Sequence, residues 1–195
     1  MLVSLARSVP LMETPSFTWT PLSPSDFLSD TPPSTSLQLI TQHTLPLLLD
    51  LLDHLTTSCG WAAERIHLFG WGQAGSVVLE LARAVGLGAE GKRLGSVTSI
   101  CGPLQSTPAL NASLSLPTPV LYFTRHATPP QTQLLKRTFK PDGLTIVTCP
   151  GPEGAMPRGA EEWTHVMRFW SGVLVRDDWM RGAGGKDGEV YEVVP

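Results

Sequence analysis

The residues with the clearest chemical potential form a glycine-rich turn, Gly70-Trp71-Gly72-Gln73-Ala74-Gly75, between a short apolar run and a helical segment. Two chemistries fit this spacing. As G-x-G-x-x-G, the turn is typical of a nucleotide-binding loop whose backbone amides hold a phosphate at a helix N-terminus. As G-x-S-x-G, it would be a nucleophile elbow in which Gly72 stands where a serine is needed. A tight strand-to-helix turn without chemistry is the third interpretation.

Several observations weigh against the nucleotide loop. Such a loop usually opens its domain, but here about 65 residues precede it. The next expected strand, 95–101, ends without the acidic residue that would bind a ribose, and bulky Trp71 and Gln73 stand where backbone must approach a ligand. An elbow instead needs small residues on both sides of a strained central position, and this turn has them around Gly72. Glycine tolerates the strained backbone but has no hydroxyl.

The turn lies in a chain whose strand and helix signals alternate. Apolar residues three or four positions apart predict a helix over 37–55, which Pro46 either kinks or opens anew and Gly60 ends. Apolar strands are expected at 66–69, 95–101, 119–123 and 144–149, and further helices at 76–85, 131–139 and 161–175. This alternation predicts an α/β fold, with a mostly parallel sheet flanked by helices on both faces. Ligands of such folds bind at the carboxyl ends of the strands.

We expect a single domain over residues 1–195, because 195 residues with 42% hydrophobic content can bury one core. Residues 1–34 are rich in Pro, Ser and Thr, and we expect them to be irregular apart from one short strand or helix. The Gly-rich residues 181–195 are expected to form a flexible tail that ends in an edge strand at 189–194.

Composition excludes several classes of function. The formal net charge is −3 and no cluster of Lys and Arg is present, which argues against nucleic-acid partners. No apolar run has the length of a membrane span. The three cysteines are isolated from one another, which fits a reducing compartment and a cytoplasmic location. The five histidines show no metal-ligand spacing, so we expect no metal and no cofactor.

The stretch CGWAAERIHLFGWGQAGSVVLELA (59–82) resembles the elbow region of α/β-hydrolases of the phospholipase/carboxylesterase class, the acyl-protein-thioesterase-like family and its fungal relatives. Active members of that family read G-F-S-Q-G-G at the elbow. Here Gly70, Gln73 and Gly75 match, Ala74 replaces a glycine, and Gly72 replaces the serine. The resemblance continues through VTSICGPL, TPVLYF and AMPRGAEEWTHVMRFWSGVL. It implies an α/β-hydrolase-like domain that is shortened at its N-terminus, since the family's first strand and its H-G phrase are not found.

The resemblance also places the other members of a catalytic triad. The acid would follow the strand 119–123, where Thr128 stands and no carboxylate lies nearby. The histidine would follow 144–149, near Gly154, in a stretch without histidine. With Gly72 in the nucleophile's place, all three positions are vacant, which predicts a protein that does not cleave the esters and thioesters its family hydrolyses. The family's backbone oxyanion donor corresponds to Gln73.

Few other residues could supply chemistry. His126 follows the strand 119–123 and is the best candidate for residual acid–base catalysis, against the interpretation as a solvated loop histidine. Cys101 ends another strand, where a buried structural cysteine is favoured over a nucleophile. Trp71 would line an apolar pocket suited to an acyl chain.

Three functions therefore remain open. The first is a non-catalytic protein that binds an acyl chain or an acylated protein. The second is a carboxylic-ester or thioester hydrolase with residual activity. The third is a nucleotide-binding module that uses Gly70, Gly72 and Gly75. The sequence does not indicate an oligomeric state.

Overall fold

The structure is a computed structural model that describes residues 7–11, 14–18, 37, 40–88, 91–108 and 114–174. Its strands are β1 (Arg7–Leu11), β2 (Thr14–Thr18), β3 (His67–Trp71), β4 (Ser96–Ile100), β5 (Val120–Thr124) and β6 (Leu144–Thr148). Its α-helices are α2 (Leu45–Asp53), α3 (Gln73–Leu87), α4 (Pro129–Thr138) and α5 (Gly159–Val173). Short 3₁₀ turns at Ala63–Arg65 and Pro141–Gly143 lead into β3 and β6.

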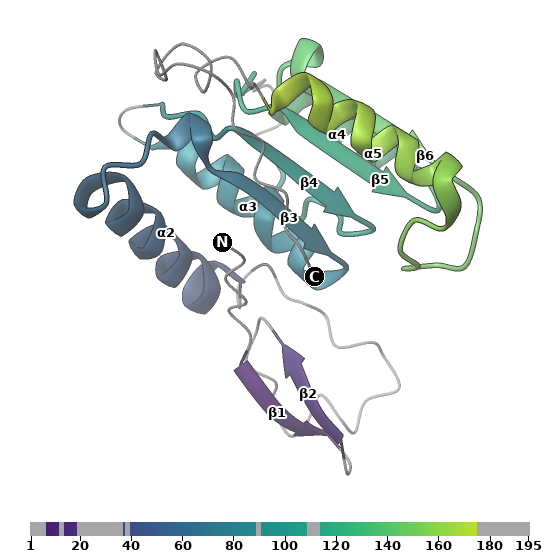
Figure 1. Cartoon of the computed structure of the whole chain (residues 1–195), viewed down its shortest axis with the longest axis horizontal. Coiled ribbons are helices and arrows are strands. Elements are labelled where there is room, and N and C mark those ends of the chain that lie inside the picture. Colours follow the sequence, from purple (N-terminus) through teal and green to yellow (C-terminus); the bar gives the residue numbers. More distant parts are fainter. Residues whose placement is uncertain are drawn as a thin grey trace, which may run out of the picture.

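Strands β3, β4, β5 and β6 form one sheet in that order, and every neighbouring pair is parallel (Figure 1). Parallel neighbours need crossover connections, which α3 supplies between β3 and β4 and α4 supplies between β5 and β6. The predicted α/β fold with a parallel sheet is therefore confirmed. Because the strands run the same way, the loops after β3, β4, β5 and β6 meet at one end of the sheet.

Helices cover the sheet on both faces, as Figure 1 shows. Strand β5 illustrates the division, because successive side chains of a strand point to opposite faces. Val120 and Tyr122 belong to the larger core, which α2, α3 and α4 build with the sheet. Leu121 and Phe123 point the other way, into a smaller core closed by α5.

The edge strands are less covered than the inner ones. Every residue of β4 and β5 is buried, as expected for a parallel sheet between two helix layers. The expectation of full coverage does not hold for β3, where His67, Phe69 and Trp71 are exposed. Strand β3 lies at an edge of the described sheet rather than at its centre. His67 is hydrogen-bonded through Nδ1 to Ser96 Oγ of the neighbouring strand at 2.9 Å.

The helix predicted over 37–55 begins with a π-helical turn, Ile40–Thr44, and continues as α2. Pro46 is the second residue of α2, where the absence of its N–H breaks no bond within that helix. Proline cannot donate back to residue 42, which accounts for the looser turn before it. After a further π-helical turn over His54–Ser58, Gly60 has φ +69°, the left-handed conformation that ends helices.

The N-terminal segment contains a hairpin. Strands β1 and β2 pair antiparallel, with Pro10 opposite Pro15, whereas we expected one short strand or helix within 1–34. Proline is tolerated in a strand where its missing N–H is not needed, and a two-stranded ladder leaves half of its N–H groups unpaired. Because prolines usually argue against a strand, the sequence did not predict this hairpin. The tail 181–195 and its expected strand 189–194 lie outside the described residues.

Within the described part of the chain, none of the helices combines the length and the apolar character that crossing a membrane would need.

Candidate functional site at the turn between β3 and α3

The glycine-rich turn links the last residue of β3, Trp71, to the first residue of α3, Gln73. Gly72 lies between them with φ +56° and ψ −124°, a conformation that strains any residue with a side chain. Its N–H donates to Ile100 O at 2.8 Å, which ties the turn to β4. A Cβ built on Gly72 would meet no atom within 4 Å, so a side chain at this position would project into open space.

The other glycines of the turn allow backbone segments to touch. A Cβ on Gly70 would collide with the carbonyl of Ala74, and a Cβ on Gly75 would lie 2.6 Å from Ser99 Oγ. Gly102, after β4, packs against the backbone of Gly72 and leaves no room for a Cβ. Close packing on the inside and open space at Gly72 together make a rigid turn whose tip is accessible. This is the geometry that a nucleophile elbow requires.

Trp71 connects the turn to the loop after β6. Its indole N–H donates to Gly154 O at 2.6 Å, and Gly154 has φ +68°. Trp71 is 53% exposed, and Phe69, two residues earlier on the same side of β3, is 44% exposed. Phe69 also contacts Trp170 of α5 edge to face, with 6.0 Å between the ring centroids. An exposed aromatic strip therefore runs along β3 up to Gly72.

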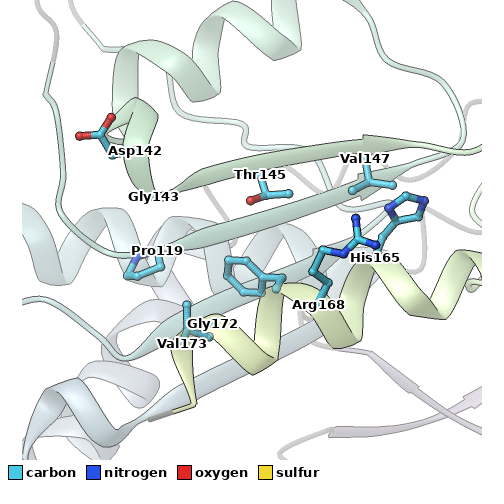
Figure 2. Close-up of a pocket in the computed structure, with 10 residues that line it drawn as sticks. Pro119, Asp142, Gly143, Thr145, Val147, His165, Arg168, Gly172 and Val173 are labelled. Atoms are coloured by element: carbon cyan, nitrogen blue, oxygen red, sulfur yellow. The ribbon is translucent and has the colours of Figure 1, made fainter.

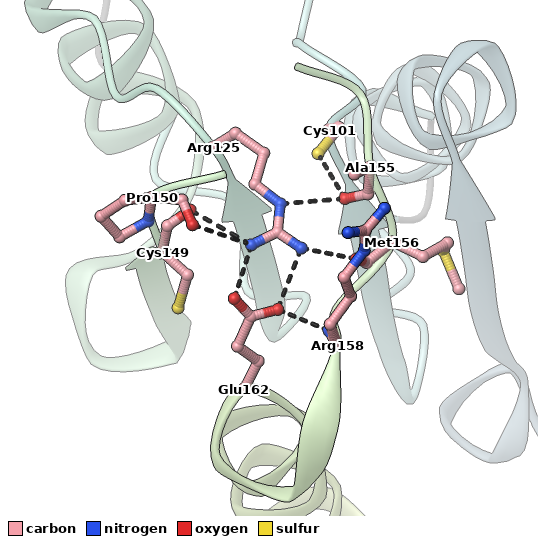
Figure 3. Close-up of polar contacts among 8 residues, drawn as sticks. All are labelled: Cys101, Arg125, Cys149, Pro150, Ala155, Met156, Arg158 and Glu162. Carbon is pink, nitrogen blue, oxygen red and sulfur yellow. Dashed lines mark hydrogen bonds and ion pairs between the residues drawn. The ribbon is translucent and has the colours of Figure 1, made fainter. Parts of the chain in front are cut away.

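A buried arginine holds together the loops that follow β5 and β6 (Figure 3). The Arg125 side chain forms a two-pronged ion pair with Glu162 in the first turn of α5, with Nη1–Oε1 at 2.7 Å and Nη2–Oε2 at 2.9 Å. The same guanidinium donates to four backbone carbonyls, those of Cys149, Pro150, Ala155 and Met156. Only 3% of Arg125 is exposed. Every branch of the guanidinium is thus engaged in structure.

Glu162 has a second partner, since the N–H of Arg158 donates to its Oε2 at 2.5 Å. The hydrogen bond from Arg125 lowers the pKa of Glu162, and the bond from the Arg158 amide acts in the same direction. In turn, Glu162 raises the pKa of Arg125. Both groups therefore stay ionised around neutral pH. Glu162 has the role of an anchor and is not placed to act as a general base.

The positions expected for an acid and a histidine contain neither. Thr128 is exposed and precedes α4, where its carbonyl accepts the N–H of Thr132 at 3.0 Å. Gly154 contributes its carbonyl to the contact with Trp71. His126 is exposed, and its backbone, rather than its ring, is hydrogen-bonded to Thr124 Oγ1. Within the described residues, the ring of His126 makes no hydrogen bond, so nothing orients it toward Gly72.

Cys101 is the nearest candidate for a thiol nucleophile, because it directly follows β4 and has φ +56°. Its thiol donates to Ala155 O at 3.5 Å. Burial raises the pKa of Cys101, and the nearby Arg125 compensates in part. A thiol that stays protonated and points at a carbonyl is a weak nucleophile, which supports the structural interpretation.

Two charged anchors were not identified from the sequence. Arg125 is the first residue after β5, a position that resembles an ordinary exposed loop. Glu80 is buried within α3, where its Oε1 accepts the N–H groups of Gln105 and Ser106 at 2.8 and 2.7 Å. The sequence feature that could have identified Glu80 is its position as a single acid within the apolar run VVLELA. Buried carboxylates of this kind are usually matched by hydrogen-bond donors.

Among the residues that the structure describes, no three His, Cys, Asp or Glu side chains come together in a way that could hold a metal ion.

Comparison with known proteins gives a partial match. No family model matches the chain. Over 133 residues, the chain is 35% identical to a protein of Mycosarcoma maydis named as an uncharacterized hydrolase. The match covers 66% of this chain and 49% of that protein, so the chain spans about half the length of this relative. This similarity and the parallel sheet support a hydrolase-like α/β protein.

Proposed function

From this hydrolase-like architecture, we propose that the chain is an α/β-hydrolase-fold protein of the phospholipase/carboxylesterase class that binds acyl compounds without cleaving them. The observation that carries the proposal is the backbone of Gly72. It has φ +56° and ψ −124° at the tip of β3, with open space where a side chain would project. A strained position of this kind is costly for other residues and is found where a nucleophile must be displayed. Here it displays none.

Acyl transfer by this fold needs a nucleophile, a base that removes its proton, and a third group that orients the base. Gly72, Thr128 and Gly154 offer no such groups. The loops after β5 and β6, where the base and its partner would stand, are joined instead by Arg125 and Glu162. Since both ion-pair partners are used to fix the loops, we infer that this end of the sheet is a scaffold rather than a proton-transfer site.

The proposed ligand follows from the aromatic strip on β3. Phe69 and Trp71 present large apolar surfaces beside the turn, on the face of the sheet that α5 covers. Exposed aromatic side chains gathered in this way are typical of binding surfaces. An acyl chain of a lipid or an acylated protein has the matching chemistry, and a cytoplasmic acylated protein is a suitable source.

The nucleotide alternative receives less support. A phosphate loop needs free backbone amides at the helix N-terminus. The Gly72 amide, part of the glycine-rich turn, already donates to Ile100 O at 2.8 Å and is not available to a ligand. Residual hydrolysis through His126 would need that exposed ring to reach the turn, and no hydrogen bond in the described residues holds it there.

Binding can be tested by isothermal titration calorimetry of the full chain with decanoate, decanoyl methyl ester, NAD and ATP. We expect saturable heat with the two decanoyl compounds and none with the nucleotides. Trp71→Ala should abolish the decanoyl signal. Trp61→Ala is the matched control, because Trp61 is also about half exposed (48%) but is not part of β3. Nucleotide binding without acyl binding would contradict the proposal.

A further inference from the structure

A groove of about 430 Å³ lies between β6 and α5 (Figure 2). Thr145 and Val147 of β6 form one side, and His165, Arg168, Phe169 and Val173 of α5 form the other. No lining residue belongs to the turn at 70–75 or to the loop 149–158. The groove is therefore distinct from the candidate site.

The groove exists because α5 is anchored over the inner strands. Val166 is fully buried, and the indole N–H of Trp170 donates to Thr98 Oγ1 of β4 at 2.9 Å. Trp170 also contacts Phe69 on β3. These contacts hold the helix toward β3 and leave the same face of β6 uncovered, so Thr145 is exposed and Val147 is half-buried.

Strand β6 is an edge strand of the described sheet, paired on one side with β5. An edge strand presents unpaired N–H and C=O groups that another extended segment can satisfy. A segment added beside β6 would direct alternate side chains toward α5, into the groove. The site thus fits an extended peptide better than a compact molecule.

We propose that residues 189–194 of this chain, EVYEVV, occupy the groove and add to the edge of β6. Helix α5 ends at Val173, which itself lines the groove. From Leu174, the last described residue, 15 residues lead to Glu189. An extended chain of that length reaches about 50 Å, whereas a five-residue strand spans about 17 Å. The segment can therefore reach either end of β6.

Charge and hydrophobicity match on the two sides. The groove presents the cationic side chain of Arg168, which makes no ion pair within the described residues, beside apolar Phe169 and Val147, while the acid of the lining, Asp142, lies ahead of the start of β6. In an extended segment, Val190, Glu192 and Val194 would share one face, with an acid between two apolar residues. The stretch 187–195 contains three acids and no Lys or Arg.

Hydrogen–deuterium exchange of the full chain tests this assignment. Successive N–H groups of a strand point to opposite sides, so the double variant Glu192→Pro/Val193→Pro removes one donor toward β6 in either register. We expect amides of both 144–148 and 190–194 to be protected in the natural sequence and to exchange at least about 10-fold faster in this variant. Inner strands β4 and β5 should keep their rates. Gly184→Pro/Gly185→Pro is the matched control and should change neither segment.

A charge swap tests the chemistry of the contact. Arg168→Glu should speed exchange in 190–194, and adding Glu192→Arg should restore most of the protection. Unprotected amides at 190–194 in the natural sequence would overturn the proposal. So would protection of β6 that rises with protein concentration, which would indicate a second copy of the chain on this edge.

Discussion

The guanidinium of Arg125 and the carboxylate of Glu162 meet in a two-pronged ion pair, with Nη1–Oε1 at 2.7 Å and Nη2–Oε2 at 2.9 Å, between the end of β5 and the first turn of α5. Through its contacts, the pair joins the loops that follow β5 and β6, in which the proposed function expects a missing acid and a missing histidine. In this chain, the hydrogen bonds of Arg125 hold those loops in place, and the ion pair needs both Arg125 and Glu162 to be charged. The consequences can be measured as stability, pH dependence and reactivity.

Removing the arginine should destabilise the fold. Arg125→Ala would leave Glu162 without its ion-pair partner and would remove a donor from four backbone carbonyls. Breaking a buried ion pair from one side typically costs 3–5 kcal/mol, so we expect the free energy of unfolding to fall by about 3 kcal/mol in urea titrations. Arg125→Lys keeps the charge but loses the two-pronged geometry of the guanidinium, so the loss of unfolding free energy should be intermediate. A loss below about 0.5 kcal/mol, typical of a surface residue, would contradict the anchoring role.

The ion pair also predicts a dependence of stability on pH. Because Arg125 lowers the pKa of Glu162 in the folded state, this carboxylate contributes stability above its unfolded pKa. That contribution is lost as the pH falls through the lower, folded pKa. Urea midpoints measured between about pH 6 and pH 3 should therefore decline less steeply in Glu162→Gln than in the natural sequence. Identical slopes would show that the pair is not coupled to folding.

The open space at Gly72 allows a serine to be introduced. Gly72→Ser should fold, with a loss of about 1–3 kcal/mol for the strained backbone, and it should not gain esterase activity because no base is placed beside it. Gly70→Ser is the matched control, because its Cβ would collide with the Ala74 carbonyl and should prevent folding. Circular dichroism and a thermal melt distinguish the two variants. Equal stability of both would contradict the geometry of the turn.

The three cysteines should differ in reactivity. Cys59 is exposed, whereas Cys101 and Cys149 are partly buried and burial raises the pKa of both thiols. Titration with a chromogenic disulfide near pH 8 should therefore show one fast thiol and two slow ones. Cys59→Ser should remove the fast phase. A fast phase that persists and disappears in Cys101→Ser would instead identify an activated thiol at the end of β4.

How far the sequence predicts this molecule depends on the feature. Alternating apolar strands and helices predicted the parallel α/β sheet, since period and turn residues are local signals. The position of a strand in the sheet is not a local signal, so the sequence did not predict that β3 lies at an edge with exposed side chains. The hairpin β1–β2 was not predicted, because Pro10 and Pro15 argue against strands in the sequence.

In the candidate site, too, local features were predicted from the sequence and contacts between distant residues were not. The glycine spacing at 70–75 predicted a sharp turn, because small residues report close backbone contact directly. Arg125 and Glu162 lie 37 positions apart in the sequence, and their pairing depends on where α5 packs. Glu80 likewise finds its donors 25 and 26 residues away. Such pairings can be identified only from the three-dimensional arrangement of the sheet and its helices.

The most direct test of the central claim is hydrolysis of p-nitrophenyl esters of two to ten carbons by the purified full chain. Loss of a complete triad costs on the order of 10⁶-fold in rate, so we predict no turnover above the spontaneous reaction. Turnover that scales with protein concentration and disappears in a folded Gly72→Val variant would contradict the account.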